Sequence, residues 1–510
     1  MAYYEATGKD KLLGVMERMA QHIMNRFGED KIPGIPGHQE VEIGLMRMYH
    51  ATGKEAYKDM ARYFLEERGK NPNFFKEETE RRGWTHFGNM IPDDTKYNQS
   101  HATIYEQDEA VGHAVRAGYM YSGMADVAAI TGDSSYVRAI DRIWENIVGK
   151  KIYITGGIGA RHEGEAFGDN YELPNLTAYN ETCAAIGNVY TNYRLFLLHG
   201  DAKYFDVLER TLYNGLISGV SLDGGRFFYP NPLACDGKYR FNADHTITRQ
   251  PWFGCACCPS NISRFIPSLP GYVYAVKDDK VYVNLFLSNR TKLKVNGKNV
   301  VLEQETSYPW NGDIRLTVAK GNQPFVMNVR IPGWVCGSVL PGGLYSYADG
   351  EELAYRVSVN GQEVKGALQK GYLSIDRRWK KGDVVEIHFD MQPRVVKAND
   401  KVAADRGRVA IECGPLVYCA EWPDNDFDIS TLLLNRHPKF QVVERPDLLG
   451  GINEITTRAQ ALSYDATGRL AAKDVKLTLI PYYAWAHRGE GRMEVWLPIE
   501  VGAASAELQE

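Results

Sequence analysis

The hydrophobic period of this sequence changes once, near residue 275, and no single fold class accommodates both parts. Before that point, apolar residues recur at three- and four-residue spacing, as between Leu12 and Phe27, which is typical of amphipathic helices. After it, apolar and polar residues alternate, as in DVVEIHFDM at residues 383–391, which is typical of strands. A chain of 510 residues is also too long for one hydrophobic core. The sequence therefore predicts a multidomain protein with a helical part followed by a β part.

A short turn built around one glycine recurs through the helical part. It reads ATGKDKL, ATGKEAY, ITGDSSY and LHGDAKY, at residues 6–12, 51–57, 130–136 and 198–204. Each glycine stands where the preceding helix should end, because glycine adopts the left-handed cap without strain, and each turn is followed by a new amphipathic segment. The repeat predicts helical hairpins at residues 37–69, 107–149 and 181–220, with half-hairpins at 10–28 and from 258 onward.

Long loops separate the predicted hairpins, at residues 70–106, 150–180 and 221–257. Loops of this length in a compact domain usually carry function. In an antiparallel ring of helices the short turns collect at one end and the long loops at the other. We therefore predict an (α/α) toroid whose site lies at the long-loop end. Residues 1–7 resemble the last turn of a helix whose beginning is absent, so we expect the ring to lack its first helices.

The β part divides into two predicted β-sandwich units. Turn signals separate its strands, and Asn360-Gly361 is a strong hairpin signal. We expect the helical domain at residues 1–274, one sandwich at 275–394 and a second at 395–510, with the last strand as a candidate to return to the first sandwich. No low-complexity linker separates these units, so we expect them to pack tightly against one another.

Composition and charge exclude some classes of partner. The net charge of -5 argues against a nucleic-acid partner, which would favour a basic face. No apolar run reaches the ~18–20 residues that a membrane span needs, and the first residues, MAYYEATGKDK, lack the pattern of a secretory signal. We therefore expect a cytoplasmic protein without a membrane partner.

The cysteines point to a metal. Three of the 8 cysteines are Cys255, Cys257 and Cys258, and in a reducing compartment such clustering indicates metal binding or catalysis. Cys257 and Cys258 open one predicted helix, and Glu181-x-Cys183 opens its neighbour in the ring. Thiolates and a carboxylate suit zinc, and a helix N-terminus favours the thiolate form. These four residues predict a zinc site, with buried core cysteines or a purely structural zinc as the alternatives.

Three motifs carry a resemblance to a known family: GEAFG at residues 164–168, ETCA at 181–184 and CACCPSN at 255–261. With these motifs the chain resembles glycoside hydrolase family 127, the β-L-arabinofuranosidases. The resemblance implies an (α/α)6 barrel followed by two β-sandwiches, a zinc ion held by one Glu and three Cys, and a retaining mechanism with a Cys nucleophile. In the family, further helical hairpins precede the point that corresponds to residue 1.

Carried over position by position, the resemblance makes Glu181, Cys183, Cys257 and Cys258 the zinc ligands. Cys257 matches the nucleophile and Glu165 the general acid/base, whose role would need a raised pKa. The family's sugar-contacting positions correspond in this chain to His38, His113 and Tyr229, which lie in the motifs PGHQE, GHAVRAGY and FFYPNPL. For each of these three, a packing residue is the alternative interpretation.

The resemblance implies a β-L-arabinofuranoside of plant cell-wall glycans as substrate. Two alternatives stay open: another pectic furanoside, such as a branched acidic sugar, and a non-catalytic carbohydrate-binding protein with a structural zinc. By class analogy a homodimer is possible. No role is assigned to the remaining cysteines, which are Cys235, Cys255, Cys336, Cys413 and Cys419.

Overall fold

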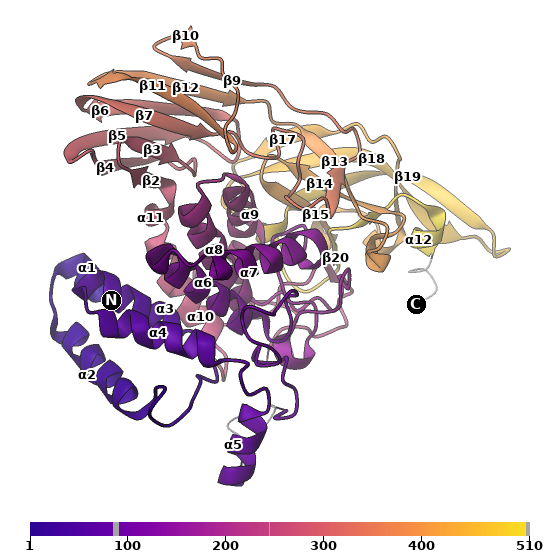
Figure 1. The fold of residues 1–510 in the computed structure, drawn as a ribbon. Coiled ribbons are helices and arrows are strands. Elements are labelled where there is room, and N and C mark those ends of the chain that lie inside the picture. Colours follow the sequence, from indigo (N-terminus) through magenta and orange to yellow (C-terminus); the bar gives the residue numbers. More distant parts are fainter. Residues whose placement is uncertain (85–90, 244, 506–510) are drawn as a thin grey trace.

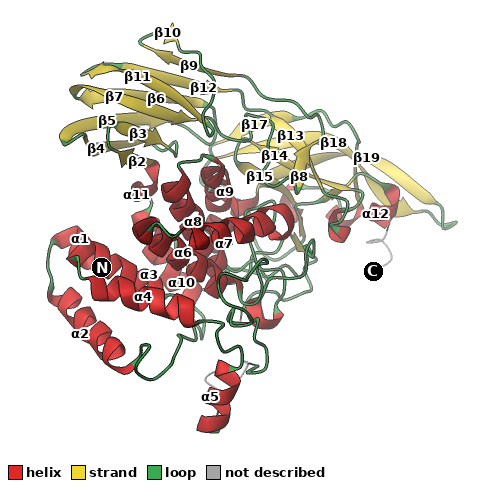
Figure 2. Ribbon diagram, viewed as in Figure 1, coloured by secondary structure: helices red, strands yellow, loops and turns green. Residues whose placement is uncertain are grey.

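The computed structural model describes residues 1–84, 91–243 and 245–505, with helices in the first half of the chain and strands in the second (Figures 1 and 2). Residues 85–90 and 244, which belong to two of the predicted loops, and residues 506–510, which end the predicted second sandwich, lie outside the described residues. The last helix of the helical part ends at Val273 and the first strand of the β part begins at Tyr274. This confirms the change of class predicted near residue 275.

The predicted helical hairpins are confirmed as antiparallel pairs, α3–α4, α6–α7 and α8–α9. The four recurring glycines end helices in the left-handed conformation, with φ between 64° and 70°. The helices are α1 (Ala2–Thr7), α2 (Lys11–Arg26), α3 (Val41–Thr52), α4 (Glu55–Glu67), α5 (Phe74–Arg82), α6 (Ala114–Thr131), α7 (Ser134–Asn146), α8 (Thr182–His199), α9 (Lys203–Thr211), α10 (Cys257–Phe265), α11 (Pro270–Val273) and α12 (Val501–Ser505).

One predicted loop contains a helix. Residues 70–106 were expected to be a loop, but α5 occupies Phe74–Arg82 and projects away from the other helices (Figure 1). Only Phe75 of this helix is buried. Its apolar residues do not repeat at helical spacing, which is why the hydrophobic period gave no signal for it.

Helices α6 and α8 form the centre of the helical part. Both are buried around most of their surface, and their backbones approach closely at Gly118 and Gly187. A Cβ atom on Gly118 would lie 3.1 Å from the carbonyl carbon of Gly187, so the glycines allow an approach that larger residues would prevent. With α10, these helices begin around one cavity, which the next subsection describes.

Two sheets follow the helices. A six-stranded sheet has the order β10-β9-β12-β6-β5-β4, and a four-stranded sheet has the order β11-β7-β3-β2. Apolar side chains from both sheets belong to the same buried cluster as the helical core. Their strands are β2 (Tyr274–Lys277), β3 (Lys280–Val283), β4 (Asn289–Val295), β5 (Lys298–Thr306), β6 (Asp313–Lys320), β7 (Asn322–Arg330), β9 (Tyr355–Val359), β10 (Gln362–Glu363), β11 (Tyr372–Lys380) and β12 (Val384–Phe389).

A third sheet of 11 strands holds the C-terminal part. Its strands are β1 (Ala234–Cys235), β8 (Tyr345–Tyr347), β13 (Pro393–Ala398), β14 (Arg408–Cys413), β15 (Leu416–Glu421), β16 (Leu432–Leu434), β17 (Gln441–Arg445), β18 (Ile452–Tyr464), β19 (Leu470–Pro481), β20 (Met493–Glu494) and β21 (Leu497–Pro498).

Strand exchange between the sheets differs from the expectation. The last described strand, β21, pairs with β14 of the same C-terminal sheet and does not return to the sheets before it. Instead β8, from the preceding segment, pairs with β13 and joins the C-terminal sheet. Strand β1, from the helical part, joins the same sheet through β20. Strands this far apart in the sequence carry no local pattern from which their pairing could be predicted.

Buried ion pairs join α9 to the strands. Arg330 at the end of β7 is fully buried and pairs with Asp206, at 2.9 Å, and with Glu209. Arg210 pairs with Glu412 of β14 at 2.6 Å, also out of contact with water. Removing one partner of such a pair would leave an unpaired buried charge, which is strongly destabilising. The tight packing expected from the lack of linkers is therefore enforced by charge as well as by apolar contact.

Among the described residues, no helix has both the length and the apolar character needed to cross a membrane.

Candidate functional site

A cavity of about 560 Å³ lies where α6, α8 and α10 begin. Every predicted site residue except Cys258 lines it, and Cys258 is fully buried. Side chains from the segments before α3 and α10 complete the wall, including His38 and Tyr229. The expectation that the long-loop segments meet at one end of the helices thus agrees with the position of this cavity.

Four of the lining and underlying residues form a compact donor cluster. One ligand atom each from Glu181, Cys183, Cys257 and Cys258 lies within 4.8 Å of the others. Glu181 caps the N-terminus of α8, and Cys257 begins α10. Because the two helix starts are neighbours, residues 76 positions apart converge, as Cys257 Sγ and Glu181 Oε1 do at 3.6 Å.

The donor chemistry of this cluster fits a metal ion. Glu181 is 2% exposed, and its Oε2 has no hydrogen-bond partner. A buried carboxylate oxygen without a partner is costly unless a cation or donor compensates it. All eight cysteines, each in the described part of the chain, are free thiols. Three thiols and one carboxylate are the donor types that bind zinc in four-coordinate sites.

Cys257 differs electrostatically from its two partner thiols. Hydrogen bonds from Cys183 and Cys258 lower the pKa of the Cys257 thiol to about 2, against the opposing effect of burial. The Tyr229 hydroxyl lies 2.8 Å from Cys257 Sγ and lowers this pKa further. Burial instead raises the pKa of Cys258. Among the three thiols, Cys257 is therefore the one that most readily loses its proton.

Glu165 stands on another wall of the cavity. It ends the tight turn Glu163–Glu165 and has a φ of 52°, an uncommon backbone conformation for a residue with a side chain. His113 Nε2 lies 2.8 Å from Glu165 Oε2, and the Tyr179 hydroxyl donates to Oε1 at 2.9 Å. Backbone strain of this kind costs about 1–3 kcal/mol and tends to persist at functional sites.

The pKa of Glu165 differs from the expectation. Burial raises the pKa of this carboxyl. The hydrogen bonds from His113 and Tyr179 lower the same pKa by a larger amount, so the net shift is downward. An apolar pocket alone would raise the pKa of this carboxyl, as expected from the sequence. The two donors lie 52 and 14 positions away along the chain.

The tautomer of His113 follows from its place as the N-cap of α6. Its Nδ1 accepts a hydrogen bond from the backbone N–H of Arg116 at 3.4 Å. Burial lowers the pKa of His113, so the ring is neutral and its one proton is on Nε2. The ring therefore donates to Glu165.

A buried lysine holds the two segments that carry His113 and Glu165. Lys151 Nζ donates to the carbonyl oxygens of Ala110, at 2.8 Å, and Gly168, at 3.0 Å, and pairs with Glu109 at 2.7 Å. Lys151 is 3% exposed. Its position fixes the distance between the segment before α6 and the loop after Glu165.

We expect Lys151→Met to lower kcat by about ten- to a hundredfold, because a misplacement of a catalytic group by a fraction of an ångström to 1 Å costs that much. Metal content should be unchanged, since no donor of the Glu–Cys cluster contacts Lys151. Steady-state kinetics with elemental analysis would check both. Lys150→Met is the matched control and should keep wild-type kcat. Loss of metal in Lys151→Met would contradict the positioning role.

The other predicted sugar-contacting residues also face the cavity. The His38 ring lies 6.0 Å from the His113 ring, and its Nδ1 has no hydrogen-bond partner. Burial lowers the pKa of His38 to about 3, so it is neutral. Tyr229 is held next to α8 because the Thr182 N–H donates to its carbonyl oxygen at 2.9 Å.

The sequence did not predict several residues in or beside the cavity. Tyr179, which contacts Glu165 from beside the cavity, was not singled out because nothing in its surroundings distinguishes it among 31 tyrosines. Arg116 and Tyr97 line the wall, with the Arg116 guanidinium 4.6 Å from the centre of the Tyr97 ring. Arg116 lies in the GHAVRAGY motif, so its distance from His113, one helical turn, was a usable signal.

The C-terminal part supports the loop that precedes Cys257. Arg249 is 2% exposed and donates to the Trp485 carbonyl oxygen at 2.6 Å and to the Ser218 carbonyl oxygen at 3.0 Å. Its guanidinium also lies 4.3 Å from the Phe228 ring, next to Tyr229. The helical part therefore does not build this wall of the cavity alone.

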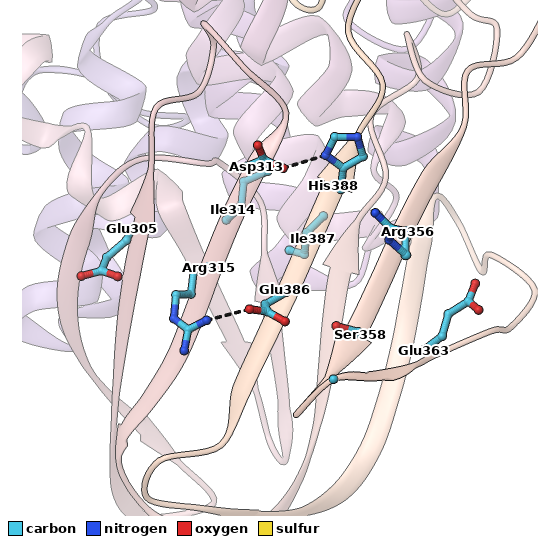
Figure 3. Close-up of a pocket in the computed structure, with 11 residues that line it drawn as sticks. Glu305, Asp313, Ile314, Arg315, Arg356, Ser358, Glu363, Glu386, Ile387 and His388 are labelled. Carbon is cyan, nitrogen blue, oxygen red and sulfur yellow. Dashed lines mark hydrogen bonds and ion pairs between the residues drawn. The ribbon is translucent and has the colours of Figure 1, made fainter.

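A second hollow, of about 580 Å³, lies on the exposed face of the six-stranded sheet (Figure 3). Two pairs of its charged side chains bridge β6 and β12, Arg315 with Glu386 at 2.7 Å and Asp313 with His388 at 2.6 Å. No thiol is found among its described lining residues. The paired side chains are exposed to water, so we interpret this hollow as a solvated sheet face and look for the chemistry in the first cavity.

Comparisons with known proteins agree along the whole chain. The family model of the β-L-arabinofuranosidase GH127 catalytic domain matches residues 1–271. The GH127 middle-domain model matches residues 280–391, and the family 127 C-terminal domain model matches residues 393–498.

Individual relatives give the same result. A non-reducing end β-L-arabinofuranosidase of Bifidobacterium longum subsp. longum is 35% identical, over 97% of this chain and 76% of the relative. A solved GH127 β-arabinofuranosidase is 65% identical with a TM-score of 0.90, covering 98% of this chain and 75% of that chain. A GH127 β-L-arabinofuranosidase from Geobacillus stearothermophilus T6 is 41% identical with a TM-score of 0.90, covering 98% and 78%.

Proposed function

Because this chain belongs to glycoside hydrolase family 127, we propose that it hydrolyses β-L-arabinofuranosides of plant cell-wall glycans with retention of configuration. One observation carries the proposal: the thiol group of Cys257, whose pKa is lowered, and the carboxyl group of Glu165 line the same cavity. Glu181 lies within 4.8 Å of the donor atoms of both. A nucleophile at Cys257 and an acid/base at Glu165 would lie within reach of one sugar ring.

In the proposed first step, Cys257 Sγ attacks the anomeric carbon and the bond to the leaving oxygen breaks. The leaving oxygen keeps the electron pair of the broken bond and receives a proton from Glu165. In the second step the Glu165 carboxylate takes a proton from water, the water oxygen bonds to the anomeric carbon, and the carbon–sulfur bond breaks. Two inversions give net retention.

The residues around Glu165 control its proton. His113 and Tyr179 hydrogen-bond to the carboxylate and orient it, which suits the base of the second step. A sugar in the cavity removes water from Glu165 and strengthens the effect of burial, which raises its pKa. With the sugar bound, the Glu165 carboxyl would therefore take up a proton and could act as the acid of the first step. His38, His113 and Tyr229 would contact the sugar hydroxyls.

The Glu–Cys cluster would hold a zinc ion through Glu181, Cys183, Cys257 and Cys258. When bound, zinc would keep the thiols deprotonated and orient Cys257. Glu181 Oε1, which lies 3.6 Å from Cys257 Sγ and 3.3 Å from Cys258 Sγ, and the three free thiols support this assignment.

We also propose that the helical hairpins belong to an (α/α)6 barrel at residues 1–274. The sheets would form two β-sandwich units at 275–394 and 395–510. The antiparallel helical pairs and the order of the three sheets support this division.

The proposed function is tested by release of p-nitrophenol from p-nitrophenyl β-L-arabinofuranoside. We expect turnover that a zinc chelator abolishes and added zinc restores, because the thiolate nucleophile depends on the metal. The α-L-arabinofuranoside with the same leaving group is the matched control and should react far more slowly. Full activity after verified metal removal would overturn the zinc–thiolate mechanism.

Freshly purified protein should contain about one zinc per chain. Cys183→Ser should lower zinc occupancy and the melting temperature together, because a bound metal stabilises the native state by its own binding free energy. Elemental analysis and thermal unfolding measure the two effects. Cys336→Ser, which changes a thiol outside the cluster, should leave zinc content unchanged. Wild-type protein without any transition metal would count decisively against the assignment.

A further inference from the structure

A second set of metal-ligating atoms adjoins the Glu–Cys cluster. The imidazole of His113 and the carboxylates of Glu165 and Glu181 each place a donor atom within 4.8 Å of the other two. His113 and Glu181 are nine-tenths or more buried, whereas the Glu165 side chain is 29% exposed. One nitrogen and two carboxylates with an open side toward the cavity resemble the three-ligand sets that bind zinc with a fourth, exchangeable position.

Glu181 belongs to both sets, and its two oxygens have different surroundings. Its Oε1 lies 3.3 Å from Cys258 Sγ and 3.6 Å from Cys257 Sγ. Its Oε2 is buried without any hydrogen-bond partner. A carboxylate can bind one cation with each oxygen, which is how paired metal sites about 3.5–4 Å apart are bridged. The free Oε2 is therefore available to a second cation while Oε1 serves the thiol cluster.

We propose that the cavity contains a second divalent-cation site, formed by His113, Glu165 and Glu181, which inhibits the enzyme when it is filled. The proposal rests on the proposed function, because inhibition follows only if Glu165 is the acid/base. A cation bound to Glu165 would compete with the proton that the carboxyl must give and take. The imidazole favours transition-metal ions such as Zn²⁺ or Co²⁺ over Mg²⁺ and Ca²⁺, which prefer oxygen ligands.

The second site should bind more weakly than the thiol cluster. It has no thiolate ligand, and a cation at His113 Nε2 must displace the proton that this nitrogen carries. That proton leaves to water or moves to Nδ1, which would break the 3.4 Å hydrogen bond from the Arg116 N–H. The thiol cluster therefore fills first, and the second site fills only with metal in excess.

Cobalt separates the two sites because thiolate-bound Co²⁺ gives intense charge-transfer absorption and Co²⁺ bound by nitrogen and oxygen gives weak bands. Metal-free protein would be titrated with Co²⁺ alone, with absorbance and equilibrium dialysis followed together. We expect about two Co²⁺ per chain, with the intense band complete after the first. In Glu165→Gln, binding should stop at one Co²⁺. The intense band of the thiol cluster should stay intact in this variant, and its presence would show that the variant is folded.

Two variants sharpen the test. His113→Gln should also lose the second Co²⁺, and Glu163→Gln, an exposed change in the same turn as Glu165, should keep both. Saturation of the wild type at one Co²⁺ would overturn the second site, as would two Co²⁺ in Glu165→Gln. Absence of the intense band at any Co²⁺ concentration would instead overturn the metal assignment of the proposed function. The two failures are therefore distinguishable.

Discussion

Cys257→Ala should abolish turnover while the protein keeps part of its metal. The thiolate is the only group proposed to bond to the anomeric carbon, and loss of a nucleophile costs about 10³-fold or more in kcat. Three donors of the cluster remain in this variant, namely Glu181, Cys183 and Cys258, so metal binding should weaken rather than vanish. Kinetics on p-nitrophenyl β-L-arabinofuranoside, combined with elemental analysis, would measure both effects.

The neighbouring cysteines are controls for this variant. Cys258→Ala removes a buried donor that does not line the cavity. It should reduce metal affinity first and turnover as a consequence, so that excess metal partly restores its activity. Cys255→Ala changes an exposed thiol of the same loop that is outside the donor cluster, and should keep its metal. A Cys257→Ala protein with near-normal turnover would exclude this residue as the nucleophile.

Glu165→Gln should lower kcat by about 10²–10⁴-fold, the usual contribution of general acid–base catalysis. Glutamine keeps the size of the side chain and can still accept from Tyr179, but it cannot give a proton to the leaving oxygen. The rate of the first step needs the protonated carboxyl, so in the wild type it falls as pH rises and Glu165 loses its proton. The variant should not show this decrease in rate with rising pH in its pH–rate profile.

The leaving group distinguishes an acid from a binding residue. A substrate whose leaving group needs no proton should restore the first step in Glu165→Gln, leaving the second step as the slow one. Glu163→Gln is the matched control, because it changes an exposed carboxylate two residues away. If turnover of Glu165→Gln falls equally for good and poor leaving groups, Glu165 acts in binding and not in proton transfer.

Local pattern was sufficient for most elements of the fold. The hydrophobic period distinguished helices from strands, and glycines such as Gly53 and Gly132 marked helix ends because the left-handed cap is a property of one residue and its neighbours. The positions of Cys183 and Cys257 at helix starts could be predicted for the same reason. Helix α5 could not, since its sequence has no helical apolar period and only one buried residue.

The sequence by itself determined which donors the site contains, because Glu181-x-Cys183 and Cys257-Cys258 are local motifs at the starts of neighbouring helices. Only the tertiary structure decided how Glu165, the proposed acid/base, is held. The hydrogen bonds from His113 and Tyr179 reverse the expected pKa shift of Glu165, and Lys151 fixes the segments on either side. Likewise, Arg249 reaches the C-terminal part 236 positions away. Such contacts join side chains that are remote in sequence, and their energies depend on distance and burial in space, which no hydrophobic period encodes.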